Sequence, residues 1–83
     1  MASYVLLLKD YEDDEKVIYR FGPHEESMGK IQLDKVTGKL LEVEAIPDQE
    51  LPSRFYFDCA AMKLATCLSR ENGMFPERMA FES

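Results

Sequence analysis

Alternation of apolar and polar residues along the first half of the chain is the feature that most limits how this sequence can fold. Residues 16–21, 29–34 and 39–46 each place an apolar side chain at every second position. Residues 3–9 precede them and are rich in Val, Leu and Tyr, as strands usually are. Such alternation is typical of strands with one buried face. The pattern therefore predicts an antiparallel sheet whose other face is solvated.

The segments between these strands carry turn residues. Asp34 can accept backbone hydrogen bonds at the start of a turn, and Gly38 can adopt a positive φ at its end, which predicts a tight hairpin. Gly22-Pro23 is expected to end the strand before it, because proline cannot donate a hydrogen bond to a neighbouring strand. The positions expected to face the core are Val17, Tyr19, Phe21, Ile31, Leu33, Leu41, Val43 and Ala45.

The second half of the chain changes to a helical period. Residues 54–72 predict an amphipathic helix with Ser53 as its N-cap and Asn72-Gly73 as its exit. Residues 78–82 predict a last strand. The predicted core arc of the helix contains Phe57, Ala60, Ala61, Leu64, Cys67 and Leu68, with Tyr56 at its edge.

These elements predict one α+β domain spanning residues 1–83. We expect an antiparallel sheet of four to five strands with one helix packed on one face, in the order ββββαβ. A chain of 83 residues is long enough for a single thin core and for no second domain.

Charge and hydropathy make several classes of partner unfavourable. Ten Lys and Arg residues face sixteen Asp and Glu residues, a net charge of −6, which argues against binding to nucleic acid. Arg20 and Arg54 lie beside aromatic residues that can stack on bases, but no two basic residues are adjacent. No apolar run approaches the roughly 18 residues of a membrane span. No basic segment of the signal-peptide type opens the sequence, so we expect a cytoplasmic protein that binds neither membrane nor nucleic acid.

Residues with catalytic or metal-binding chemistry are few and scattered. Cys59 and Cys67 would lie about 12 Å apart along one helix, too far to form a disulfide with each other. The acidic residues 10–15 lack the glycine and the final glutamate of a calcium loop. His24 has no second metal ligand at a suitable spacing. We therefore expect no enzyme activity, no catalytic residues, no metal and no cofactor.

An apolar stripe on the outer side of the predicted helix is the strongest indication of function. Phe55, Cys59 and Met62 fall outside the predicted core arc, and with Thr66 they follow the spacing of one continuous helical stripe. An exposed stripe that contains Phe and Met is typical of a contact surface. The leading hypothesis is a small non-enzymatic protein-interaction module that binds a protein partner or associates with itself as a homodimer.

A second hypothesis is a small-ligand-binding protein or minor enzyme with a pocket between the helix and the sheet. Its polar residues would be Tyr19, Arg20, His24 and Tyr56. Ligand pockets usually exceed roughly 300 Å³, which is demanding for a core this thin.

The chain from residue 31 onward also resembles a family of small bacterial proteins of unknown function. The resemblance lies in residues 31–39, in the aromatic-rich helix and in residues 71–78, Glu-Asn-Gly-Met-Phe-Pro-Glu-Arg. Family members often continue with Trp-Tyr, where this chain has Phe81-Glu82-Ser83. The resemblance implies a bacterial protein and no particular activity, so no functional residue is carried over from it.

Overall fold

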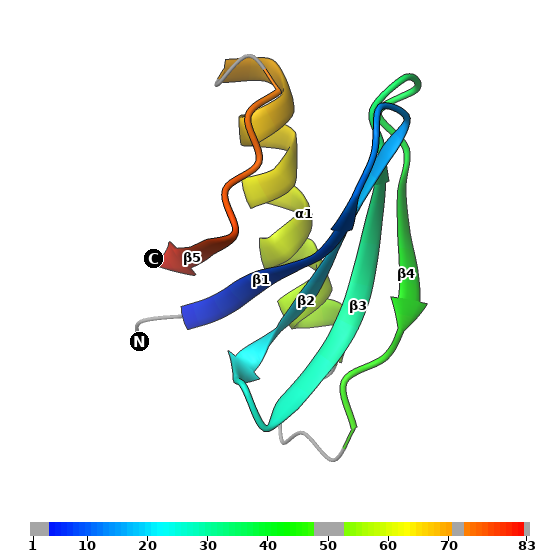
Figure 1. Ribbon diagram of the computed structural model, residues 1–83. Helices are drawn as coiled ribbons and strands as arrows, with labels where there is room; N and C mark the ends of the chain where they lie inside the picture. Colours follow the sequence, from blue (N-terminus) through cyan, green and yellow to red (C-terminus); the bar gives the residue numbers. More distant parts are fainter. Residues whose placement is uncertain (1–3, 48–52, 71–72, 83) are drawn as a thin grey trace.

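Five strands and one helix form the structure, a computed structural model that describes residues 4–47, 53–70 and 73–82. The strands make one antiparallel sheet, and the helix lies across one of its faces (Figure 1). The elements are β1 (Tyr4–Glu12), β2 (Lys16–His24), β3 (Ser27–Asp34), β4 (Leu40–Glu44), α1 (Ser53–Arg70) and β5 (Arg78–Glu82). The predicted α+β class and the order ββββαβ are confirmed.

The order of strands across the sheet is β4-β3-β2-β1-β5, and all neighbours are antiparallel. The first four strands run back and forth as a meander. The chain then crosses the sheet as α1 and returns as β5 beside β1 (Figure 1). In the described part of the chain, β4 and β5 are therefore the two edges of the sheet.

The core lies between the sheet and α1. The residues of β2 and β3 that were predicted to face inward are each at most 1% exposed; they are Val17, Tyr19, Phe21, Ile31 and Leu33. Ala60, Leu64 and Cys67 of α1 are buried equally well, and the small Ala60 lets the helix lie close to the strands. Phe57 packs edge-on against Phe21, with 6.2 Å between the ring centroids. The prediction that the apolar face of the helix packs against the sheet is confirmed.

The orientation of α1 about its axis differs slightly from the predicted one. Cys59 and Tyr56 are buried, whereas Phe57, Ala61 and Leu68 are half-buried. The helix is thus rotated toward β5 by less than one residue step of about 100°. The reason lies in β5, because its residues Met79 and Phe81 pack on that side of the core. Cys67 Sγ, for example, lies 3.7 Å from Met79 Sδ.

The helix ends agree with the prediction as far as they are described. Ser53 is the first residue of α1, but its side chain lies outside the described residues, as does Asn72. Gly73 has a φ of 74° and donates its N–H to the carbonyl of Cys67 at 3.0 Å. A residue in this conformation ends the helix, as glycine does most readily.

The inward residues predicted for β4 are wrong by one position. Leu41 and Val43 are 58% and 50% exposed, and Ala45 is also exposed. Leu40 instead pairs with Leu33 and packs on the core. Directly paired residues share a face of the sheet, so the register with β3 places Leu41 beside Gln32 on the outer face. The alternating pattern thus predicted the strand but placed Leu41, rather than Leu40, on the inner face.

The turns are as predicted at one place and different at another. Asp34 Oδ1 accepts hydrogen bonds from the amides of Val36 and Thr37 at 2.8 and 3.1 Å, and Gly38 has a φ of 77°, which confirms the hairpin. Pro23, by contrast, does not end β2, which continues to His24 across an irregularity in its pairing with β3. Such an irregularity tolerates proline because no ladder hydrogen bond is needed from it.

Candidate functional site

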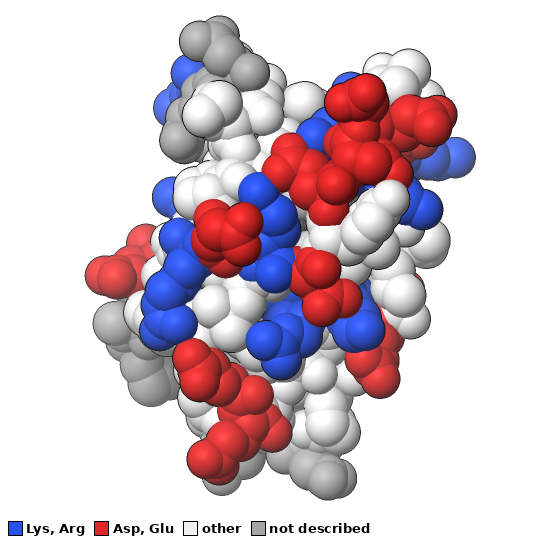
Figure 2. Space-filling model, viewed as in Figure 1, with Lys and Arg blue, Asp and Glu red and all other residues white. Residues whose placement is uncertain are grey.

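The outer face of the sheet, opposite α1, carries charges of both signs (Figure 2). Lys30 pairs with Asp10 at 3.5 Å, and Arg78 pairs with Glu25 at 3.1 Å. Both pairs are exposed, so their contribution to stability is small. On this face acidic side chains gather over the turn between β1 and β2 and near the turn between β2 and β3, and basic side chains lie mainly between these two groups (Figure 2).

A hollow of about 560 Å³ opens on this outer face beside the turn between β2 and β3. Its floor is Leu6, which is only 4% exposed although it points away from the helix. The hollow brings His24 near Arg78, whose guanidinium is already paired with Glu25. Its lining residues are Tyr4, Leu6, Pro23, His24, Glu25, Glu26 and Arg78.

The four residues proposed to line a pocket between helix and sheet are not brought together. Tyr19 is fully buried and donates its hydroxyl hydrogen bond to the carbonyl of Pro76, and burial raises the pKa of its phenol. Tyr56 belongs to the core. Arg20 and His24 are exposed, Arg20 within β2 and His24 at its end. Core side chains thus occupy the space in which that pocket was expected.

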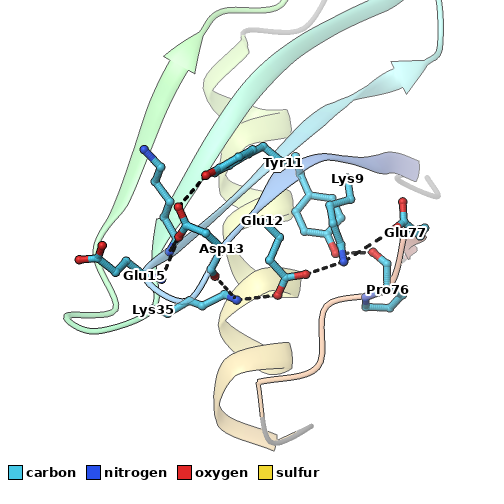
Figure 3. A network of polar contacts seen from close by, with 10 residues as sticks. Lys9, Tyr11, Glu12, Asp13, Glu15, Lys35, Pro76 and Glu77 are labelled. Carbon is cyan, nitrogen blue, oxygen red and sulfur yellow. Dashed lines mark hydrogen bonds and ion pairs between the residues drawn. The ribbon is translucent and has the colours of Figure 1, made fainter.

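A polar network near the turn between β1 and β2 connects β1, the turn between β3 and β4, and the segment before β5 (Figure 3). Glu12 accepts hydrogen bonds from Lys35 Nζ at 2.5 Å and from Lys9 Nζ at 2.6 Å. Lys35 and then Lys9 lower the pKa of the Glu12 carboxyl. Lys9 also lies 3.8 Å from the carboxylate of Glu77, in the segment before β5 (Figure 3).

Within the acidic residues 10–15, Asp13 stabilises the turn between β1 and β2. Asp13 Oδ1 accepts hydrogen bonds from the amides of Glu15 and Lys16 at 2.8 and 2.9 Å, and its Oδ2 accepts one from Tyr11 at 2.8 Å (Figure 3). The bond from Tyr11 and the two amides lower the pKa of Asp13. Residues 4–47, 53–70 and 73–82 contain no group of three or more His, Cys, Asp or Glu side chains placed to hold a metal ion.

These turn carboxylates predict how stability depends on pH. The pKa values of Asp13 and Asp34 are lowered in the folded protein by amide or hydroxyl donors. Their contribution is therefore present above the ordinary carboxyl pKa of about 4 and is lost as the pH falls through the lower folded values. We expect the urea midpoint to fall steeply below about pH 4. The fall should be shallower in Asp34→Asn, which keeps an acceptor oxygen without the charge.

The control for this measurement is Asp14→Asn, an exposed residue of the same acidic segment. Its urea midpoint should fall below about pH 4 as steeply as that of the wild type. An equally steep fall of the urea midpoint in Asp34→Asn and in the wild type would show that the Asp34 carboxylate does not cause the loss of stability in acid.

A groove of about 380 Å³ lies between α1 and β5. Met62, which is 61% exposed, and Thr66 contribute the helical side of this groove. Ala80 and Phe81 contribute the strand side. We call this site the α1–β5 groove; its lining residues are Met62, Lys63, Thr66, Ala80, Phe81 and Glu82.

Only part of the predicted apolar stripe reaches this groove. Met62 lines it, as an interface residue would. The prediction that Cys59 faces outward is wrong, because Cys59 is 8% exposed and packs in the core, where burial raises the pKa of its thiol. Phe55 is half-buried, and its ring packs edge-on against Tyr56 at 5.4 Å. Cys59 lies on the same side of α1 as Lys63 and Thr66, which line the groove beside β5.

The strand beside the groove presents an open edge. The amide of Lys9 donates to the carbonyl of Glu77 at 2.8 Å, just beyond the ladder between β1 and β5. Because hydrogen-bonded pairs alternate in an antiparallel ladder, Met79 and Phe81 direct their backbone groups toward β1. Ala80 and its neighbours at either end direct theirs away from the sheet. No described strand lies on that side.

The sequence reasoning did not identify the groove residues of β5. A signal was present, however, because residues 78–82 place the large apolar Met79 and Phe81 two positions apart and carry Arg78 at one end and Glu82 at the other. This pattern indicates a contact surface only in combination with the position of β5, which lies at an edge of the sheet next to Met62.

Within the described residues, no helix combines the length and the apolar character needed to cross a membrane.

Comparison of the chain with protein-family models, with curated proteins and with solved structures gave no match, so the family resemblance of residues 31–39 and 71–78 stays a prediction.

Proposed function

We propose that this protein is a small non-enzymatic interaction module of the bacterial cytoplasm, which binds another polypeptide at the α1–β5 groove. The observation that carries the proposal is an exposed methionine, Met62, beside a strand edge with outward-directed backbone groups. An added strand gains main-chain hydrogen bonds from such an edge, and the adjacent groove selects its side chains.

The other edge of the sheet supports the choice of β5 by contrast. The strand β4 carries Glu42 and Glu44, and its pairing with β3 has an irregularity between Lys30 and Ile31. Charged side chains and irregular pairing are common protections of an edge against further strands. The edge formed by β5 has a regular register with β1 over all five of its residues.

The proposed compartment is supported by the cysteines. Cys59 and Cys67 carry buried thiols and form no disulfide. Buried thiols fit the reducing conditions of a cytoplasm, where disulfides are rare. The bacterial origin rests on the resemblance in residues 31–39 and 71–78.

Exchange of Met62 for glutamate tests the proposed surface. Met62→Glu is expected to leave the fold intact, because the side chain is exposed, and to weaken association at least about tenfold by placing a charge in an apolar contact. The readouts are sedimentation analysis of self-association and the binding of peptides selected from a random display library. The matched control is Leu41→Glu, an equally exposed apolar residue on β4, away from α1 and β5.

Circular dichroism and the urea midpoint report whether both variants are folded. Equal association by wild type and Met62→Glu, with both folded, would contradict the proposed surface. Loss of association in Leu41→Glu alone would move the binding surface to the outer face of the sheet.

A further inference from the structure

The edge of β5 is complementary to itself. We infer that its partner is a second copy of this chain: β5 pairs antiparallel with β5 of that copy, around a two-fold axis at Ala80. The inference rests on the proposed function of the α1–β5 groove and specifies the partner. It depends on three observations, namely the directions of the backbone groups, the charges at the two ends of the strand and the apolar residues beside it.

The backbone fixes which residues can pair. Met79 and Phe81 use their N–H and C=O groups toward β1, so a strand added outside must bond to Arg78, Ala80 and Glu82. A symmetric antiparallel pair can meet this condition with its axis at any residue of β5, through either a hydrogen-bonded or a non-hydrogen-bonded pair. An axis at Met79 or Phe81 would pair only three of the five residues. With the axis at Ala80, all five residues of β5 find a partner; with the axis at either end, most of the strand is left unpaired.

Charge favours the same register. An axis at Ala80 places Arg78 of each copy opposite Glu82 of the other, so that two opposite-charge pairs form across the interface. In the single chain, Arg78 contacts Glu25 at 3.1 Å, and the two side chains are 60% and 62% exposed. The guanidinium is thus accessible from solvent and has donors to share between both carboxylates.

The apolar residues of the edge also match. Val5 and Leu7, which are fully buried, pair with Phe81 and Met79, so these two side chains of β5 face the helix side of the sheet. In the proposed register, Met79 of one copy lies opposite Phe81 of the other. The added strand would also approach the α1–β5 groove and cover Met62.

Ala80 suits the position on the axis. It pairs with Leu6, which points away from the helix, so its own side chain lies on the outer face of the sheet. Two alanines meeting there would leave the strands unobstructed at their closest approach. A larger side chain at this position would meet its own copy across the axis.

The opposite edge does not share this property. Self-pairing of β4 in the equivalent centred register would place Glu42 opposite Glu42, and like charges across a ladder are destabilising. One self-complementary edge gives a closed isologous dimer, whereas two such edges would give an open fibre. The proposed assembly therefore stops at two copies.

Charge exchange tests the register directly. Arg78→Glu leaves an edge with two acidic ends, and Glu82→Arg leaves one with two basic ends, so each variant alone opposes like charges twice. Each is expected to dimerise at least about tenfold more weakly than the wild type in sedimentation equilibrium. An equimolar mixture of the two should recover a dimer, because the introduced glutamate of one then faces the introduced arginine of the other.

Two further variants complete the experiment. Glu25→Gln removes the present partner of Arg78 and should leave dimerisation unchanged or stronger. Ala80→Cys should give a covalent dimer on oxidation, because hydrogen-bonded cross-strand residues lie about 5.5 Å apart, within disulfide range. Ala65→Cys, an exposed position on α1, is the control that should not cross-link efficiently.

The outcomes separate this inference from the proposed function. A wild-type chain that is monomeric at about 100 µM while selected peptides still bind in a Met62-dependent way would overturn the dimer and keep the interaction surface. A dimer that ignores the charge exchange would overturn the register. Absence of both self-association and peptide binding would overturn both proposals.

Discussion

Replacement of Leu64 by alanine is expected to lower the free energy of unfolding by about 2–5 kcal/mol. Leu64 is fully buried near the middle of α1, among core residues from both the sheet and the helix. Truncation removes apolar contacts and leaves a cavity that the close-packed strands cannot fill. The domain has only 83 residues, so a loss of this size takes a large part of its stability.

Urea denaturation followed by circular dichroism measures this loss. The matched control is Leu41→Ala, the same chemical change at a residue that is 58% exposed on the outer face. It should cost about 0.5 kcal/mol or less, as surface changes usually do. A Leu64→Ala variant as stable as Leu41→Ala would contradict the packing of α1 on the sheet.

Replacement of Gly29 by alanine is expected to separate β4 from β3. A Cβ atom at Gly29 would lie 2.3 Å from the carbonyl oxygen of Glu44 and 3.0 Å from backbone atoms of Ala45 and Ile46. All three contacts are to backbone, so no side-chain rotation can relieve them. Overpacking that forces backbone shifts usually costs about 1–3 kcal/mol, and we expect the upper end of this range or more.

Amide hydrogen exchange reports the location of this change. The amide of Leu41, in the part of β4 that pairs with β3, should exchange much faster in Gly29→Ala, whereas that of Leu7 in β1 should change less. Gln32→Ala, on the same strand, is the control and should keep the β4 amides protected. Protection of β4 in Gly29→Ala equal to that in the wild type would contradict the close approach.

Local sequence patterns were sufficient for most of the fold. Asp34 and Gly38 determine their hairpin through short-range backbone hydrogen bonds and a positive φ, both of which can be predicted from residue type. Ala60 and Leu64 were assigned to the core by helical periodicity alone. These features depend on neighbours within a few residues, which the sequence presents directly.

Features set by distant pairing could not be predicted in the same way. The phase of β4 follows from the pairing of Leu33 with Leu40, and the sequence offers two adjacent leucines for that place. Cys59 is buried on the side of α1 that lies next to β5, and the place of β5 beside β1 depends on pairing between the two ends of the chain. The groove beside Met62 has the same origin, since its two walls are separated by the whole connection from α1 to β5.

The hydrogen bond from Tyr19 to Pro76 links the open edge to the centre of the domain. Tyr19 belongs to β2, in the middle of the sheet, and Pro76 immediately precedes the residues that lead into β5. A loosened interior would release this connection and, with it, the register of the terminal strand. Only molecules whose core is already packed would then present β5 in the position needed for association.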